Sequence, residues 1–322
     1  MENNTILADR MLGCLFGQAI GDALGLGSEG MSVEEVHTSY PTGLTYYNQI
    51  IDDCRRKGII KGSWTDDTHM MLCILEAFCR DGNLEATTLA RLFIEGYDDW
   101  GETCGILTRK VLNFMPPVYL QNPIAVSKLV WELKGRDNAP NGGLMRTSII
   151  GIWPFDTETN AETACKMTHF DPRCVGSCVV VSALIHSLIW EERDLVQDDM
   201  LKIAAKYDNR ISEWIDLAYQ AKEIAELQPD HADSMAYTLR TLAIALWAFL
   251  NAQSFEEGLL AVVNAGGDAD TNAAVACAIL GAKFGYSTIP EYYIKNLHNS
   301  DAYRRRCNGF ISKIPMGDFN LQ

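Results

Sequence analysis

Apolar residues recur at helical spacing along most of this chain, and this pattern limits the fold more than any other feature. No segment shows the sustained period-two alternation, rich in β-branched residues, that marks a half-buried strand. Several segments are apolar nearly all round, which indicates helices buried on every side. The predicted fold class is therefore all-α. Helices are expected over 7–24, 68–80, 86–100, 122–133, 161–168, 172–190, 198–207, 211–225, 234–251, 255–264 and 271–284.

The chain is predicted to form a single domain over residues 1–322. Its hydrophobic fraction of 48% can supply one large core, and no linker, composition break or internal repeat divides it. The exception to the helical pattern is 30–62, which contains Pro41 and Gly43 and has no strong helical period. A loop of this length inside a compact domain is usually functional, so we expect a mobile substrate loop. Its tyrosines leave two interpretations open, a lid over a substrate and simple packing.

The charge and the cysteines indicate the setting in which the protein works. A net charge of −15 makes nucleic acid and anionic membranes poor partners. The ten cysteines include no C-x-x-C pair, and the N-terminus MENNTILADR lacks a signal-peptide pattern. The longest apolar stretches, 175–190 and 241–250, are too short or too polar to be good membrane spans. We expect a cytoplasmic monomer.

Three acidic motifs are candidates for chemistry: GDALG at 21–25 with the following Glu29, WTDDT at 64–68, and GGDADT at 266–271. The second and third each place two carboxylates where a very apolar helix begins. Helix capping alone would explain one such doublet. Two doublets before buried helices need more, because a buried carboxylate must be paired or must bind a cation. Neither cluster contains Lys or Arg, although a basic partner from elsewhere in the chain remains an alternative.

The ligand types indicate which cation would bind. Carboxylate and hydroxyl oxygens are hard ligands that suit Mg²⁺, Mn²⁺ or Ca²⁺ rather than Zn²⁺. The five carboxylates carry more negative charge than one divalent ion neutralises, and two ions about 3.5–4 Å apart would balance it better. The carboxylates in question are Glu29, Asp66, Asp67, Asp268 and Asp270.

The motifs together resemble the ADP-ribosylglycohydrolase family, which includes the dinitrogen-reductase-activating glycohydrolase and the ADP-ribosylarginine hydrolases. Five motifs occur in the family's order and span nearly the whole chain. The resemblance implies a compact orthogonal helical bundle with two Mg²⁺ or Mn²⁺ ions at the bottom of a cleft. The motifs are GDALGLGSE at 21–29, WTDDT at 64–68, NGGLMR at 141–146, MTHFDP at 167–172 and GGDADT at 266–271.

The resemblance also assigns expected roles to the acidic residues. Glu29 and Asp66 would be the catalytic residues that orient or deprotonate the attacking water, and Asp270 would bridge the two ions. The metal ligands would be Thr65, Asp66, Asp67, Asp268, Asp270 and Thr271.

Four further residues are expected to bind the substrate. The turn formed by Asn141, Gly142 and Gly143 would by itself be ordinary punctuation between helices. The resemblance implies that its backbone amides approach a diphosphate and the distal ribose, which a Cβ would block. His169 would contact a ribose or a phosphate, and its alternative is a core or capping histidine.

The activity that the resemblance implies is hydrolysis of the glycosidic bond between ADP-ribose and a modified acceptor. The NGGLMR and MTHFDP motifs are nearest to the arginine-specific branch, so the expected partner is a protein ADP-ribosylated on arginine. Serine-linked, nucleotide-linked and small-molecule conjugates remain alternatives. A non-catalytic regulator that binds ADP-ribose or metal is a further alternative, but such a protein would be expected to have lost acidic ligands, and all are present here.

Overall fold

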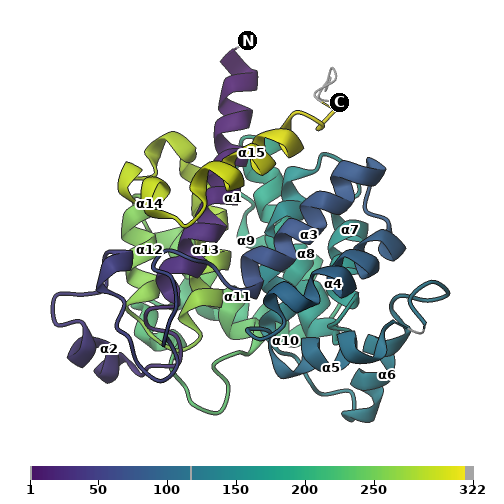
Figure 1. Cartoon of the computed structure of the whole chain (residues 1–322), viewed down its shortest axis with the longest axis horizontal. Coiled ribbons are helices and arrows are strands. Elements are labelled where there is room, and N and C mark those ends of the chain that lie inside the picture. Colours follow the sequence, from purple (N-terminus) through teal and green to yellow (C-terminus); the bar gives the residue numbers. More distant parts are fainter. Residues whose placement is uncertain (1, 117, 316–322) are drawn as a thin grey trace.

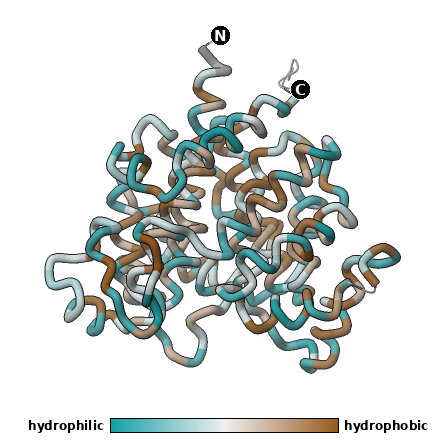
Figure 2. Tube along the Cα trace, viewed as in Figure 1, coloured by the Kyte–Doolittle hydropathy of each residue, from teal (hydrophilic) through white to brown (hydrophobic). Residues whose placement is uncertain are grey.

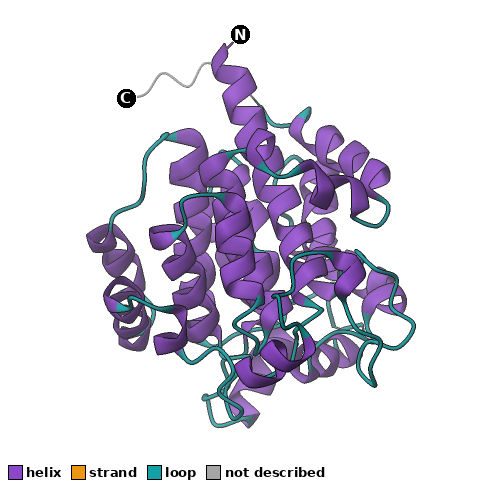
Figure 3. Cartoon of the chain, turned by 90° about the vertical axis from the view of Figure 1, so that its left-hand side faces the viewer, coloured by secondary structure: helices purple, strands orange, loops and turns teal. Residues whose placement is uncertain are grey.

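The computed structural model describes residues 2–116 and 118–315. Within this part of the chain the structure consists of fifteen α-helices and five short 3₁₀ helices. Figure 3 shows helices joined by loops without a strand, and the described residues form only one isolated β-bridge, between Pro140 and Tyr237. The all-α prediction is confirmed.

The long helices are numbered in chain order, as in Figure 1. They are α1 (Glu2–Gly25), α2 (Val33–Ser39), α3 (Asp66–Asp81), α4 (Ala86–Trp100), α5 (Ile106–Phe114), α6 (Ala125–Leu133), α7 (Thr157–Lys166), α8 (Pro172–Trp190), α9 (Gln197–Ala204), α10 (Asn209–Gln220), α11 (Thr238–Asn251), α12 (Phe255–Val263), α13 (Ala269–Phe284), α14 (Glu291–Asn296) and α15 (Ser300–Ile311).

All eleven expected helices are present, and four others, α2, α5, α14 and α15, were not expected. Four predicted boundaries were wrong by four or five residues. Helix α1 begins at Glu2 rather than at residue 7, and α7 begins at Thr157 rather than at residue 161. The helix expected over 211–225 ends at Gln220, because Ala221 is extended and a separate 3₁₀ turn follows. The helix expected from residue 234 begins at Thr238, after a turn that includes residues 231–237.

The segment 30–62 is more structured than expected. It contains α2 and a 3₁₀ turn, so the prediction of a long stretch without helix was wrong. The segment packs against the rest of the protein. Tyr47 is buried with its ring 6.1 Å from that of Tyr293, and the backbone N–H of Leu44 donates to Asn264 at 2.7 Å. Mobility and a lid role for this segment stay predictions.

The core is one connected cluster of buried apolar side chains contributed by nearly every helix. Figure 2 shows hydrophobic segments gathered toward the middle of the molecule, with hydrophilic ones around them. By length and composition α8 could cross a membrane, but 78% of its apolar window is buried inside the protein. We therefore describe α8 as a core helix, which agrees with its apolar character on all sides.

Helices α1 and α13 approach each other closely along a row of glycines. Four glycines of α1, spaced four residues apart, form one face of the helix. A Cβ on Gly13, Gly17, Gly21 or Gly25 would lie 2.2, 2.0, 2.2 or 2.4 Å from the carbonyl oxygens of Gly281, Cys277, Ala273 and Ala269, respectively. The two backbones are therefore in direct contact. Since the partner numbers fall as the glycine numbers rise, the helices run antiparallel, and the end of α1 meets the start of α13.

Replacing Gly17 by alanine should destabilise the protein. The new methyl group would overlap the backbone of Cys277, which cannot move aside as a flexible side chain could. We expect a loss of about 2–4 kcal/mol in the free energy of unfolding, measured by urea denaturation. The matched control is Gly309→Ala on the exposed helix α15, where a Cβ meets nothing within 4 Å. It should be neutral or stabilising by up to about 1 kcal/mol. Equal stability of the two variants would contradict this account of the crossing.

Candidate active site

The antiparallel crossing brings the three acidic motifs to one place. The turn after α1 carries Glu29, the first turn of α3 carries Asp66 and Asp67, and the start of α13 carries Asp268 and Asp270. We call these five side chains the carboxylate cluster. All five line a single cavity of about 610 Å³, a volume within the range of small-molecule sites. The spatial convergence expected from the sequence is therefore present.

The cavity also collects most of the other expected site residues. Asn141, Gly142, His169 and Thr271 line it together with the carboxylate cluster. Thr65 and Gly143 lie behind the lining: the hydroxyl of Thr65 donates to Asp22 at 2.9 Å, and Gly143 packs against Cys165 and His169.

Asp22 fixes the start of α3. Its two carboxylate oxygens accept hydrogen bonds from the backbone N–H and the hydroxyl of both Thr65 and Thr68, at 2.6–3.1 Å. Asp22 is fully buried, and burial raises its pKa to about 7 even though these hydrogen bonds act in the opposite direction. Asp22 therefore ties the end of α1 to the first turn of α3 and sets the direction in which Asp66 and Asp67 point.

The carboxylate cluster is under electrostatic stress. Burial raises the pKa of Asp66 to about 6, and it raises the pKa of Asp67 and Asp270 well above the ordinary value, with neighbouring carboxylates adding to the effect. The pKa of Glu29 is raised by burial and then by Asp268, while Arg56 acts against the rise. No ion pair among the described residues includes a member of the cluster.

These side chains fit a site for hard divalent cations. One oxygen each of Glu29, Asp268 and Asp270 lies within 4.8 Å of the others. Asp67 is 2% exposed, and its Oδ1 is buried without a hydrogen-bond partner in the described part of the chain. An orphaned carboxylate oxygen in a buried, all-oxygen cluster is costly unless a cation binds it. The donor set, with carboxylates and the hydroxyl of Thr271, suits Mg²⁺ or Mn²⁺.

His169 also lines the cavity and can present a hydrogen-bond donor to it. The ring is 1% exposed, and burial together with the charge of Arg146 holds its pKa well below the usual range, so the imidazole is neutral. The hydroxyl of Thr168 accepts from Arg146 at 2.6 Å and lies 2.8 Å from Nδ1 of His169. The hydroxyl hydrogen is best satisfied by Nδ1, which leaves the ring hydrogen on Nε2, beside Gly142.

The turn at 141–146 is held from two sides. Asn141 donates to Asp268 at 2.6 Å and to Thr241 at 2.9 Å, so the turn is tied to α13 and α11. On the side away from the cavity lining, the fully buried guanidinium of Arg146 donates to the carbonyl oxygen of Gly142 at 2.6 Å and lies 5.1 Å from the ring of Phe93. Arg146 thus holds the turn that carries Gly142 in place at the cavity.

Sequence reasoning missed the wall formed by α5 and the end of α6. Thr103, Ile106, Thr108 and Lys110 line the cavity from one side, and Lys134 and Asn138 line it near the end of α6. The motif search passed over this region because it has no acidic doublet and its helices are short. The available signal was charge, since the segment 105–136 contains five basic residues and one acidic residue in a strongly acidic chain.

The fold and the site together define an all-α protein whose cavity is lined by a cluster of five carboxylates. The sequence profile of the ADP-ribosylglycohydrolase family matches residues 3–317. The chain therefore belongs to the ADP-ribosylglycohydrolase family, whose members hydrolyse glycosidic bonds.

Individual relatives agree with the family assignment. An "ADP-ribosylarginine hydrolase Tri1" from Serratia proteamaculans is 26% identical over 97% of this chain and 81% of its own length. An "ADP-ribosyl-[dinitrogen reductase] glycohydrolase" from Rhodospirillum rubrum is 26% identical over 90% of each chain. A solved structure described as an "ADP-ribosylglycohydrolase-related protein complex" superposes with a TM-score of 0.70, at 24% identity, over 96% of this chain and 99% of that one. The last comparison shows the shared fold.

Neutralising one buried carboxylate should stabilise the cation-free protein at neutral pH. Because the pKa of Asp270 is raised, the folded state binds its proton more tightly than the unfolded state does. Protonation of Asp270 therefore stabilises the folded state fully below the unfolded pKa of about 4, and this contribution is lost as the pH rises through the folded pKa. In EDTA at pH 7.5, Asp270→Asn should therefore be more stable than the unmodified protein by about 1–3 kcal/mol. At pH 5 the gain should shrink.

Urea denaturation of both proteins at the two pH values measures this difference, and the contribution of buried histidines such as His169 cancels in the comparison. A variant that is less stable than the unmodified protein at pH 7.5 in EDTA would contradict the assignment of a strained, uncompensated cluster.

Proposed function

We propose that this protein removes ADP-ribose from arginine side chains of modified proteins, with two Mg²⁺ or Mn²⁺ ions bound by the carboxylate cluster. The observation that supports this most is the convergence of five carboxylates from three separate elements in one cavity, none of them in an ion pair among the described residues.

The ligands proposed for the two ions come from α3 and α13. Two divalent ions would balance four of the five negative charges of the cluster. A single divalent ion would balance two of them and leave three uncompensated. When bound, the ions would supply Lewis acidity that orients ribose hydroxyls and lowers the pKa of water. The proposed ligands are Asp66, Asp67, Asp268, Asp270 and Thr271, which line the cavity, and Thr65, whose hydroxyl donates to Asp22 behind the lining and would bind an ion through its oxygen lone pair.

Glu29 and Asp66 are the residues proposed to handle the proton of the attacking water. Glu29 reaches the cavity from the turn after α1, where Arg56 donates to its backbone carbonyl and helps to fix the turn. Both carboxylates line the cavity, so either could accept the proton of an attacking water held there. Their negative charge also favours the positive character that develops at the ribose C1″ as the glycosidic bond breaks.

The part of the cavity lined by Gly142 and His169 is proposed to hold the sugar and phosphate. Nε2–H of His169 can donate to a ribose hydroxyl or a phosphate oxygen. Gly142 leaves the space beside Nε2 open, because a Cβ there would lie 3.1 Å from that nitrogen. The contacts of Asn141 and Arg146 keep this wall in register with the carboxylate cluster.

Arginine is the proposed acceptor for two reasons. A guanidinium leaving group is a cation that an acidic cavity attracts, whereas a serine hydroxyl gains nothing from that charge. The relatives named above include an ADP-ribosylarginine hydrolase. Serine-, nucleotide- and small-molecule-linked conjugates are competing substrates in the experiment below. We also propose that the protein is cytoplasmic and monomeric.

The direct test is release of free ADP-ribose from an ADP-ribosylarginine substrate, followed by chromatography. With Mg²⁺ or Mn²⁺ we expect turnover, and with EDTA we expect none. Asp270→Asn should lower the rate at least about 100-fold, because it removes one charge from the cation site. Asp301→Asn, on the exposed surface of α15, is the matched control and should keep full activity.

Two outcomes would overturn parts of this proposal. Faster release from a serine-linked conjugate than from the arginine-linked one would replace the acceptor. Tight binding of ADP-ribose without turnover of any conjugate would indicate the non-catalytic regulator instead.

A further inference from the structure

The part of the chain that builds one wall of the cavity has the opposite charge from the rest. The whole chain contains 27 Lys and Arg against 42 Asp and Glu. The segment 105–136, which includes α5 and α6, has a single acidic residue, Glu132. Its five basic residues are Arg109, Lys110, Lys128, Lys134 and Arg136.

Only two of these basic residues line the cavity, Lys110 of α5 and Lys134 at the end of α6. Both are exposed, and neither takes part in an ion pair among the described residues. The other basic side chains of the segment have different contacts: Arg136 lies 3.8 Å from Glu132, and Arg109 donates to backbone carbonyl oxygens. The two lysines are therefore available to a ligand in the cavity.

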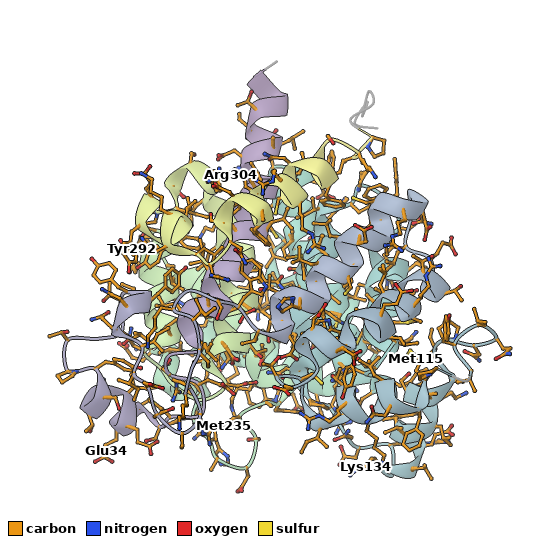
Figure 4. The ribbon with its side chains drawn as sticks, in the orientation of Figure 1. Glu34, Met115, Lys134, Met235, Tyr292 and Arg304 are labelled. Carbon is orange, nitrogen blue, oxygen red and sulfur yellow. The ribbon has the colours of Figure 1, made fainter. Side chains whose placement is uncertain are left out.

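The backbone that carries Lys134 is held firmly although its ammonium group is not. Just before it, the indole N–H of Trp131 donates to Asp171 at 3.0 Å, and just after it, the backbone N–H of Asn138 donates to the same carboxylate at 3.3 Å. Arg173 in turn donates to Asp171 at 2.8 Å. Figure 4 shows Lys134 at the lower edge of the molecule, on the α5–α6 side. This network fixes the base of Lys134 on the start of α8.

The cavity therefore combines five carboxylates with the side chains of two lysines that form no ion pair among the described residues. Ile106 and Leu107 also line the cavity and make part of the lining apolar. A ligand that matches this combination has a sugar to place beside the carboxylates, an anionic centre, and an apolar ring system. ADP-ribose contains all three parts.

We propose that Lys110 and Lys134 bind the diphosphate of the ADP-ribose conjugate and thereby orient it with the ribose C1″ toward the carboxylate cluster. This inference rests on the proposed function and adds the residues that choose the orientation. The positive charge of the lysines attracts the diphosphate and so favours the orientation that leaves the ribose C1″ beside the carboxylate cluster. The lysines are positioning residues, since they touch the substrate away from the bond that breaks.

The test measures the affinity of the full-length protein for ADP-ribose by isothermal titration in Mg²⁺. Lys110→Gln and Lys134→Gln should each weaken binding about 3-fold, and the double variant about 10-fold, as expected for partly exposed charge contacts. The affinity of the unmodified protein should fall with added NaCl more steeply than that of the double variant. Adenosine, which lacks phosphates, should bind all variants equally.

Lys128→Gln is the matched control, because Lys128 lies on the exposed face of α6 and does not line the cavity. It should bind ADP-ribose as the unmodified protein does. An ADP-ribose affinity of the double variant equal to that of the unmodified protein would overturn the inference, as would an equal loss for Lys128→Gln.

Turnover separates this inference from the proposed function. At saturating ADP-ribosylarginine the double variant should keep its maximal rate while its KM rises. If the unmodified protein binds ADP-ribose through the lysines but hydrolyses no conjugate, the proposed function fails and the lysine assignment stands. If it hydrolyses the conjugate and the lysine variants have unchanged KM and affinity, the reverse holds.

Discussion

The contact on which the site depends is the backbone-to-backbone crossing of α1 and α13. Four glycines at intervals of four residues let the two helices approach until a single methyl group would overlap a carbonyl oxygen. Because close-packed interiors cannot absorb such an overlap cheaply, the crossing fixes both the distance and the register of the two helices. Two of these glycines, Gly21 and Gly25, belong to the first acidic motif. Their role is to bring Glu29 next to Asp268 and Asp270.

That closeness has an electrostatic cost, and the surrounding structure is arranged around it. Buried carboxylates repel one another, yet here they are held close together. Their pKa is raised by burial and by the neighbouring carboxylates. Asp22 binds the first turn of α3 with both of its oxygens, so the cluster cannot relax by rotating away. A site of this kind sacrifices stability in the cation-free state for a preformed arrangement of ligands, which is the usual relation between stability and function at active sites.

Much of this was predictable from the sequence, and the failures have physical causes. Wide apolar stripes located eleven helices, and acidic doublets before apolar helices located the cluster. Helix α15 was missed because its buried face consists only of Tyr303, Cys307 and Phe310 among arginines and other polar residues. Helix α2 has a single buried side chain, Val36, although Ser32 and Glu35 form a capping box that could have indicated its start. The four-residue glycine spacing of α1 was also visible, but only the structure shows which backbone it meets.

The account stands on the claim that the carboxylate cluster is a cation site. Crystals grown with Mn²⁺ test it directly through anomalous scattering. We expect two peaks inside the cavity, each about 2.0–2.5 Å from carboxylate oxygens of the cluster, with Asp270 near both and Oδ1 of Asp67 no longer without a partner. A cavity without manganese peaks at saturating Mn²⁺, or with a lysine or arginine side chain in their place, would contradict the account.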